Sequence, residues 1–414
     1  MIKYFKNAII KNEFMQEVDG STLTNYTDRA DEIINYSSRV KFIYGLLAYG
    51  KWRDNKNLDL FQYINPKYLN FLRSKKDVYF LFDCTLEGWS PLQVNFIDIL
   101  YKNCANYHIN PSKIVFATSN LLDKENHIHY LKDKNIFNKI KIVTYPHFKT
   151  SALNSFWDIT KKERTSEVIL RYMKYRTYKE YQEKYFISFS RLNRKHRTLA
   201  SYLLYINDIE KYGLISQNKL IEESGPFKTE ESLKSFCRQL GINYTRFKEW
   251  SNTLPRTIDT NDFVTNHAHN LNVHIYSSAL FEIVNETQAS SFGNTSLFYS
   301  EKTFKPMACM TPFVIFGQQY ANEKLQDLGF KLYTDMFDYT FDREYDTRQR
   351  YMKIIETIQP IFKKLNAMSR EEQLAWKYQN EDILLHNLNI LRNEFVDIQK
   401  IIDILEDIKK EQLL

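Results

Sequence analysis

Long apolar runs are absent from this 414-residue chain. No segment approaches the roughly 18 uninterrupted apolar residues that a membrane-spanning helix needs, so we expect no membrane span. Charged side chains interrupt the first 13 residues too often for a signal peptide. We therefore expect a cytoplasmic protein.

Cysteine is scarce and scattered. The four cysteines, Cys84, Cys104, Cys237 and Cys309, include no Cys-x-x-Cys pair. This argues against a disulfide framework and against a zinc site. We expect all four to be buried as small apolar side chains.

Several nucleotide- and metal-binding motifs are also missing. The chain has no Gly-x-Gly-x-x-Gly and no Gly-x-x-x-x-Gly-Lys-Ser/Thr, which argues against dinucleotide-dependent oxidoreductases and P-loop phosphotransferases. It has no Asp-x-Asp pair to clamp a metal-bound diphosphate. The pairs His127/His129 and His267/His269 have no cysteine or third ligand nearby, so we interpret them as surface or loop histidines. We expect a site without a metal or a cofactor.

The composition is that of a globular protein, with 43% apolar and 26% charged residues. A chain of this length is sufficient for two domains, each with its own core. The net charge of +7 is compatible with a phosphorylated ligand, a nucleic acid or an anionic surface, and does not choose among them. Abundant Lys, Asn, Ile, Tyr and Phe with little Gly or Pro indicate an AT-rich genome, and so a bacterium or a phage.

Strands and helices alternate in the first part of the chain. Residues 78–82 form a continuous apolar run, typical of a strand in a parallel sheet. Such alternation is typical of βαβ units, so residues 1–154 are predicted to form a Rossmann-like domain. The elements expected after this strand are a helix at 92–104, a strand at 114–117, a helix at 128–134 and a strand at 140–145.

Asp83 and Glu87 follow the first of these strands. Open α/β sheets bind ligands at the carboxyl ends of their strands, so both residues are candidate catalytic carboxylates. Glu87 precedes Gly88, where a backbone without a Cβ can bend to admit a substrate, and we prefer it to Asp83.

Residues 155–184 are polar and basic, and we interpret them as an interdomain helical segment. Such a stripe is more often an amphipathic bridging helix, although aromatic and basic side chains could also stack on bases and contact phosphates. The tyrosines recur every third or fourth residue among the cations: Tyr172, Tyr175, Tyr178, Tyr181 and Tyr185, with Arg171, Lys174, Arg176, Lys179 and Lys184.

A second domain is predicted over residues 185–360. It opens with an apolar strand at 185–190, followed by Arg191, Arg194 and Arg197 at the start of a helix. Cations at a helix start oppose the helix dipole, and this local conflict favours an anion-binding role.

Another candidate anion site is the segment 300–306, Ser-Glu-Lys-Thr-Phe-Lys-Pro, which precedes an apolar strand and Gly317. Ser300 is a candidate N-cap. Lys302 and Lys305 near a helix N-terminus would hold phosphate, and Glu301 suits a neutral polyol such as ribose. An ordinary capping sequence before a core strand is the alternative.

This segment resembles the donor-site segment of fucosyltransferase-like and exostosin-like glycosyltransferases. The resemblance covers roughly residues 185–346 and includes the Asn-Arg-x-x-Arg-like cluster after the strand at 185–190. It implies the GT-B fold, an α/β architecture of two Rossmann-like domains facing a cleft, with a C-terminal helix crossing back. It also implies that Glu301 faces the ribose, that the lysines face the diphosphate, and that Glu286 and, more weakly, Thr287 face the donor.

The implied activity is transfer of a sugar from a nucleotide-sugar donor to an acceptor hydroxyl. Glu87 or Asp83 would deprotonate the acceptor. The acceptor is interpreted as a glycan or surface polysaccharide; the alternatives are a hydroxylated base in DNA, as in phages, or a non-catalytic module that binds an anionic polymer. Preorganised cations would stabilise the leaving diphosphate without a metal: Arg191, Arg194, Lys302 and Lys305, with Arg197 and Ser300 completing the predicted donor site.

Residues 361–414 are predicted to form C-terminal helices. Their apolar residues alternate by four and three, which is typical of a helix–helix seam. We expect the seam to pack within the chain, and a homodimer through it is the alternative. Its members are Leu384, Leu388, Leu391, Phe395, Ile398, Ile402 and Leu405.

Overall fold

The computed structural model contains two compact units, which are considered separately. The first contains the described residues up to 146 together with 296–298, and the second contains those from 148 to 289 and from 299 to 392. The structure describes residues 15–16, 41–47, 59, 61–64, 66–76, 78–85, 88, 90, 92, 96–144, 146, 148–149, 165–190, 192–222, 225–258, 271–289 and 296–392.

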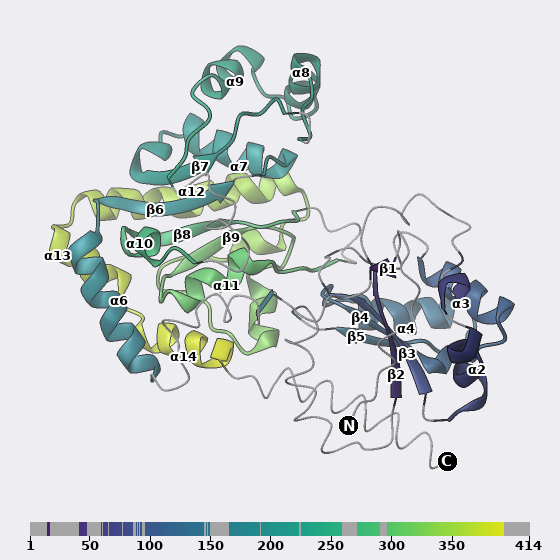
Figure 1. The fold of residues 1–414 in the computed structure, drawn as a ribbon. Helices are drawn as coiled ribbons and strands as arrows, with labels where there is room; N and C mark the ends of the chain where they lie inside the picture. The colour runs from purple at the N-terminus through teal and green to yellow at the C-terminus, as the bar shows by residue number, and fades with distance from the viewer. Residues whose placement is uncertain are drawn as a thin grey trace. The chain divides into compact units, whose positions relative to one another are not determined.

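The first unit is built on a five-stranded sheet in the order β1-β2-β3-β4-β5 (Figure 1). The pairs from β2 to β5 are parallel, and the short β1 pairs antiparallel with β2. Across the described part of this sheet the strands follow one another in sequence order. Each strand is therefore added on the same side of the one before it, and the strand order does not reverse. The strands are β1 (Met15–Gln16), β2 (Lys41–Leu47), β3 (Val78–Cys84), β4 (Ile114–Thr118) and β5 (Lys141–Thr144).

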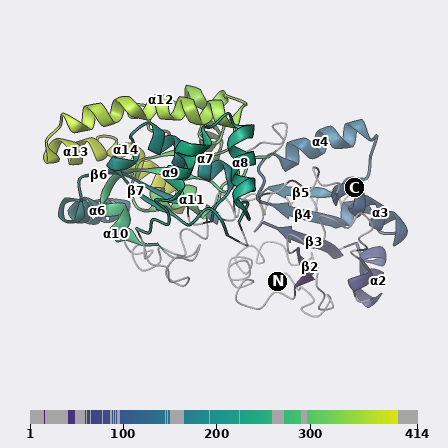
Figure 2. The same ribbon diagram turned by 90° about the horizontal axis from the view of Figure 1, so that it is seen from above.

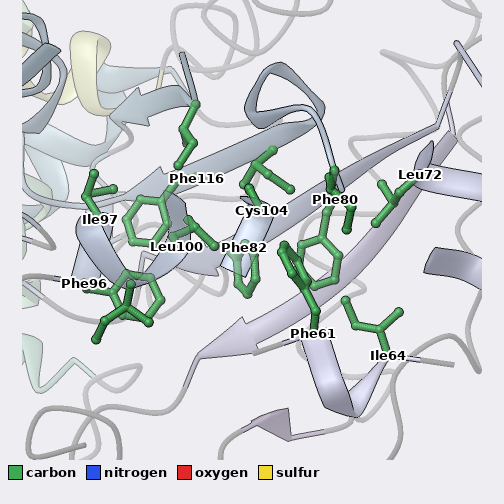
Figure 3. Packing of buried hydrophobic residues seen from close by; sticks show 14 of the residues in the cluster. Phe61, Ile64, Leu72, Phe80, Phe82, Phe96, Ile97, Leu100, Cys104 and Phe116 are labelled. Atoms are coloured by element: carbon green, nitrogen blue, oxygen red, sulfur yellow. The ribbon is translucent and has the colours of Figure 1, made fainter. Parts of the chain in front are cut away.

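Helices α2 (Pro66–Ser74), α3 (Phe96–Asn106) and α4 (Asp123–Asp133) connect these strands, with short 3-10 turns at Phe61–Tyr63 and Pro111–Lys113. Their apolar sides cover a core rich in phenylalanine (Figure 3). The rings of Phe80 and Phe82 are 4.1 Å apart, and Phe61 packs edge-on against Phe80. The predicted strand–helix alternation is confirmed here.

The second unit contains a four-stranded parallel sheet in the order β7-β6-β8-β9. The chain moves from β6 (Lys184–Ser190) to β7 (Gly213–Gln217) on one side, then to β8 (Ala279–Asn285) on the other side and on to β9 (Phe313–Phe316). The order in which strands are added to the sheet therefore reverses between β6 and β8, although the two strands run parallel. In open α/β sheets a ligand crevice forms at such a reversal, outside the carboxyl ends of the strands.

Helices cover both faces of this sheet. Side chains of neighbouring residues in a strand point to opposite faces: Phe186 of β6 contacts Phe362 of α12 (Thr347–Asn366), whereas Phe189, an odd number of positions later, contacts Tyr276 of α10 (Val273–Ser277). Accordingly, α12 and α10 lie on opposite sides of the sheet (Figure 1; Figure 2). The mixed α/β architecture, with one sheet parallel from β2 to β5 and one parallel throughout, confirms the predicted α/β fold class.

The predicted interdomain segment contains α6 (Ser166–Glu180), which belongs to the second unit. Thr165 caps its N-terminus by accepting a hydrogen bond from Val168 N. Lys174 on α6 forms an ion pair with Glu381 on α14. The other helical elements of this unit are α7 (Lys195–Ile206), α8 (Glu230–Gln239), α9 (Tyr244–Ser251), α11 (Glu301–Ala308), α13 (Arg370–Lys377) and α14 (Glu381–Arg392), with 3-10 turns at Glu210–Tyr212, Glu323–Leu328 and Thr340–Arg343.

The described part of the C-terminal seam packs inside the second unit. Leu384, Leu388 and Leu391 of α14 are buried, and α14 lies against α6 and α11. The remaining members of the predicted seam, Phe395, Ile398, Ile402 and Leu405, lie outside the described residues.

Two predictions from composition can be compared with the structure. All four cysteines are buried, as expected. Among the described helices, none is both long enough and apolar enough to cross a membrane.

Candidate functional site

The candidate site lies where β8 ends and α11 begins. Every residue of β8 is buried, and the strand leads directly into Glu286. Ser300 precedes α11 in extended conformation, and its Oγ accepts a hydrogen bond from Lys302 N at 3.4 Å. The predicted N-cap is therefore present, and it lies beside the reversal of strand order between β6 and β8.

Glu286 ties the end of β8 to the start of α11. Its carboxylate accepts hydrogen bonds from Ser300 N at 2.9 Å, Ser300 Oγ at 2.8 Å, Thr303 Oγ1 at 2.6 Å and Thr287 N at 2.5 Å. Only 1% of the residue is exposed. Because protein donors occupy the carboxylate, Glu286 positions the helix start instead of offering free acceptors to a ligand.

Residues 301–305 of α11 bring together two ammonium groups and one carboxylate. Lys302 forms an ion pair with Glu301, and Lys305 follows Glu301 by four residues on the same helical face. Burial acts to raise the pKa of Glu301, but the charges of Lys302 and Lys305 outweigh it and lower this pKa to about 2. Burial lowers the pKa of Lys305, against the opposing effect of Glu301. At neutral pH Glu301 is therefore a carboxylate between two lysines.

Two of the three arginines predicted after β6 are described, and their environments differ. Arg194 is exposed at the N-cap position of α7, whereas Arg197 is 2% exposed. Arg197 donates to the backbone oxygen of Glu286 from Nε at 3.0 Å and to Thr287 Oγ1 from Nη2 at 3.2 Å. Arg197 thus holds the loop after β8, and burial followed by the nearby Arg194 charge lowers its pKa to about 10. Arg191 lies outside the described residues.

His196, in the same segment as these arginines, also contacts the loop after β8. Its Nε2 lies 2.9 Å from the backbone oxygen of Glu286, the same atom to which Arg197 donates. Burial, and then the charge of Arg197, lower the pKa of His196 to about 3. The imidazole is therefore neutral and holds the loop without adding charge.

The two catalytic candidates of the first unit are less completely described. Glu87 lies outside the described residues, and only the backbone of Asp83 is described. Asp83 pairs with Leu46 and Ala117, so it lies within β3 and not after its end as the sequence predicted. The strand continues because Cys84 also pairs with the next strand, opposite Thr118.

The space beside Gly88 is filled by a side chain and is not open to a substrate as the sequence predicted. A Cβ built on Gly88 would lie 2.2 Å from the Cγ atom of Phe298, so this ring occupies the place where we expected the backbone to admit a substrate. Ser296 Oγ donates to the Gly88 carbonyl at 3.4 Å. Glycine is needed here for close packing of the segment 296–298 within the first unit.

A buried polar network at the end of β4 was not predicted. Asp123 accepts hydrogen bonds from Ser90 Oγ at 2.6 Å, Thr118 Oγ1 at 2.8 Å and Asn120 Nδ2 at 3.0 Å. Burial raises the pKa of Asp123 to about 8, although the hydroxyls of Ser90 and Thr118 oppose the shift. Asn120 Oδ1 in turn accepts from Leu297 N at 2.9 Å. The polar Thr-Ser-Asn sequence after the strand was the available signal, and the network serves to hold the segment 296–298.

The histidine pairs can be placed only in part. His127 is 4% exposed and packs against Tyr101 and Tyr130, so the interpretation of it as a surface or loop histidine is wrong. Burial lowers the pKa of His127 to about 4. His129 is exposed, and His267 and His269 lie outside the described residues. Within the described ranges, no group of three or more His, Cys, Asp or Glu side chains gathers as a metal site.

Comparison with known proteins identifies no family. No family model matches the chain, and no curated protein matches it. Among solved structures, an α,α-trehalose 6-phosphate synthase from Burkholderia multivorans is 12% identical, covering 95% of this chain and 78% of its own, with a TM-score of 0.39. A UDP-forming synthase from Burkholderia xenovorans, in complex with glucose-6-phosphate, is 11% identical, covering 93% and 80%, with a TM-score of 0.38.

The N-terminal domain of a trehalose-6-phosphate phosphatase from Candida albicans is 8% identical, with coverages of 92% and 75% and a TM-score of 0.38. Similarity at this level assigns neither a residue role nor a substrate. The fold and the candidate site described above therefore depend on the strands and side chains of this chain alone.

Proposed function

We propose that this chain is a glycosyltransferase that binds a nucleotide-diphosphate sugar in its second unit and moves the sugar to an acceptor hydroxyl. One observation carries the proposal: the start of α11, capped by Ser300 and braced by Glu286, presents Lys302 beside the reversal of strand order, and Lys305 follows one turn further along the helix. A helix N-terminus has unpaired backbone N–H groups and partial positive charge, so it attracts phosphate. The resemblance of residues 300–317 to GT-B donor sites supports the same assignment.

Each side chain of this site has a role in the proposal. Lys302 and Lys305 neutralise the diphosphate as it leaves, and Arg194 with Arg191 adds positive charge from the start of α7. Glu301, ionised and next to both lysines, accepts hydrogen bonds from the ribose hydroxyls. The remaining donor-site candidates, Arg197, Glu286, Thr287 and Ser300, position these groups through the hydrogen bonds between them.

The acceptor hydroxyl needs a base, for which Glu87 remains the first candidate and Asp83 the second. In this proposal the acceptor is a glycan or a surface polysaccharide. The charge of the leaving diphosphate is met by lysine and arginine side chains, so the transfer is proposed to proceed without a metal.

A thermal-shift series with UDP, GDP, CDP and ADP sugars tests the donor assignment, followed by a transfer or hydrolysis assay with any sugar nucleotide that stabilises the protein. We expect stabilisation by one nucleotide class, and release of its nucleoside diphosphate. A protein that none of them stabilises and that releases no nucleotide would instead be a non-catalytic module for an anionic polymer.

An acceptor in DNA is the second candidate, because α6 presents exposed aromatic and basic side chains. Tyr175 is 63% exposed and Tyr178 is 62% exposed. Lys179 lies 5.6 Å from the ring of Tyr175, and Arg171 is exposed one turn earlier. Such a surface suits base stacking together with phosphate contacts.

A further inference from the structure

Arg350 is a buried arginine to which the proposed function gives no role. It lies near the start of α12, and 2% of the residue is exposed. An arginine side chain has five N–H donors in a fixed planar fork. Because a buried cation is costly unless its donors are paired, this position requires several acceptors around the fork.

The acceptors of Arg350 are mainly carbonyl oxygens of the main chain. Its Nε and Nη2 donate to Gly317 O at 3.2 and 2.9 Å, and Nη2 also donates to Ala289 O at 2.7 Å. Its Nη1 donates to Glu344 O at 2.6 Å and to Tyr345 O at 3.1 Å, just before α12. One side chain therefore joins three segments of the main chain through hydrogen bonds from a charged group, which are the strong ones.

Two of these three segments adjoin Glu286. Ala289 lies in the loop that follows β8, three residues after Glu286. Glu286 N donates to the carbonyl of the last residue of β9 at 3.0 Å, and a Cβ built on Gly317 would lie 3.4 Å from the Cβ of Glu286. The Glu286 carboxylate in turn accepts from Ser300 N and Ser300 Oγ. A continuous series of contacts therefore leads from Arg350 to the N-cap of α11.

The loop after β8 is held from two helices. From α7, Arg197 and His196 contact the carbonyl of Glu286, and from α12, Arg350 donates to the carbonyl of Ala289. Arg350 differs from the α7 pair because it also holds the first residue after β9. It therefore sets how the loop after β8 lies against the end of β9.

We propose that Arg350 is a positioning residue for the donor site. By holding Gly317 and Ala289, it fixes the backbone around Glu286, and with it the place where Glu286 meets the N-cap of α11. This inference rests on the proposed function, because the site that Arg350 positions is the one assigned to the diphosphate. Without Arg350, buried carbonyls lose their donors and the two loops separate to reach water, so the start of α11 is no longer aligned for an anion.

Binding of inorganic diphosphate to wild type and Arg350→Lys tests this inference, by isothermal titration calorimetry at a temperature where both proteins are folded. Lysine keeps the positive charge but lacks the planar fork, so it cannot hold both loops in the same geometry. We expect the dissociation constant to rise about 10- to 100-fold, since displacing a binding group by about 1 Å has an effect of this size.

Lys377 provides a matched control, because it is also a buried basic side chain that donates to main-chain carbonyls of this unit. It donates to Ala279 O at 2.7 Å and to Tyr276 O at 2.9 Å. Ala279 is the first residue of β8, at the end of the strand away from Glu286. Lys377→Met should therefore lower the melting temperature and keep the wild-type dissociation constant for diphosphate.

A double-mutant cycle measures whether Arg350 acts through the N-cap. Ser300→Ala removes the cap that Arg350→Lys is expected to displace. Combined, the two changes should weaken diphosphate binding by less than the product of their separate fold-changes, because residues of one network are not independent. Effects that simply multiply would mean that Arg350 does not act through the N-cap.

Thr347→Val is a milder change to the same contacts. Thr347 Oγ1 donates to Ala289 O at 3.5 Å and accepts from Arg350 Nη2 at 3.3 Å. Valine keeps the branched shape without the hydroxyl, and the dissociation constant should rise about two- to tenfold, as for the loss of one neutral hydrogen bond. This variant tests the proposal if Arg350→Lys does not fold.

The outcomes separate the two proposals. A wild-type dissociation constant in Arg350→Lys, or in Thr347→Val where Arg350→Lys does not fold, would overturn the role of Arg350 and leave the donor site standing. Equal weakening by Lys377→Met, or multiplying effects in the cycle, would do the same. No binding of diphosphate by the wild type would overturn the donor site and with it the positioning role.

Discussion

Lys302 is the residue whose loss should weaken donor binding most directly. In Lys302→Ala the point charge at the helix start disappears, and Glu301 loses its ion-pair partner. Hydrogen bonds to charged groups contribute about 1.5–3 kcal/mol, so we expect the dissociation constant of the donor to rise about 10- to 100-fold, with lower turnover. Calorimetry with the nucleotide sugar measures this. Lys363→Ala, which removes an exposed lysine on α12, is the matched control, and unchanged donor binding in Lys302→Ala would disprove the assignment.

Glu87 should affect the chemical step and not donor binding. Because general-base catalysis contributes about 10²- to 10⁴-fold, Glu87→Gln should lose roughly that factor in kcat while binding the donor normally. Single-turnover transfer assays together with donor titrations separate these quantities. A folded Glu87→Gln protein with full turnover would mean that another group is the base, and Asp83→Asn would be the next variant to measure.

The residue scale also shows where sequence patterns are ambiguous. Glu282, Glu286 and Glu301 are three acidic residues in and after one strand and at one helix start, yet their environments differ. The Oε2 of Glu282 is buried without a hydrogen-bond partner among the described residues, Glu286 accepts from four protein donors, and Glu301 has two flanking lysines. The motif correctly identified Ser300 as an N-cap. It could not show that Glu286 binds Ser300 and Thr303, because those contacts depend on how the chain returns to the sheet.

At the scale of elements, α11 depends on its cap. Ser300→Ala removes the Oγ that accepts from Lys302 N and donates to Glu286. Loss of a serine N-cap typically costs about 1 kcal/mol, and here the donor site should also loosen, because Glu286 retains fewer donors. We expect a lower melting temperature and weaker donor binding, measured by thermal unfolding and calorimetry. Ser369→Ala, which removes the N-cap of α13, should lower stability without changing donor affinity.

Helix α13 is held to the sheet by a buried lysine. Lys377 donates to the backbone oxygens of Ala279 at 2.7 Å and Tyr276 at 2.9 Å, and lies 3.5 Å from Thr177 Oγ1. Burial lowers the pKa of Lys377 to about 7, below the usual value near 10.4. The unfolded chain then binds more protons between these values, so this lysine makes stability rise with pH from about 7 to 10.

Lys377→Met should remove that dependence. The wild type should gain stability relative to Lys377→Met as the pH rises through this window, and chemical denaturation at several pH values measures the difference. Lys363→Ala serves again as an exposed control. Parallel pH profiles for wild type and Lys377→Met would mean that Lys377 keeps its proton in the folded protein.

Strand boundaries were predictable where an apolar run ended in polar residues. The predicted strands at 114–117 and 185–190 agree with β4 and β6 within one residue. Within residues 275–284 a helix and a strand meet, because α10 ends at Ser277 and β8 begins at Ala279. No prediction covered β7, α8 or α9, which lie between the two recognisable anion clusters.

At the scale of the whole molecule, strand order carries the functional information that local patterns lack. The sequence predicted two α/β domains, and two sheets are present, one parallel except for β1 and one parallel throughout. It did not predict that β8 lies next to β6, with β7 on the far side. This order joins residues about 90 positions apart, such as Arg197 and Glu286, at one sheet edge. Local propensity does not encode a contact between residues so far apart in the sequence. The sequence could therefore predict the individual site residues but not the hydrogen bonds between them.

The last prediction concerns the surface of the whole molecule and the DNA alternative. A net charge of +7, with Arg171 and Lys179 exposed on α6, would bind duplex DNA chiefly by releasing counterions. Gel shifts between about 50 and 200 mM salt should then show a steep loss of affinity, and Lys179→Ala should reduce the slope by about one unit for one lost phosphate contact. Lys363→Ala should leave the slope unchanged if the contact is specific to α6. Absence of binding at the lowest salt would remove DNA as the acceptor and leave a glycan.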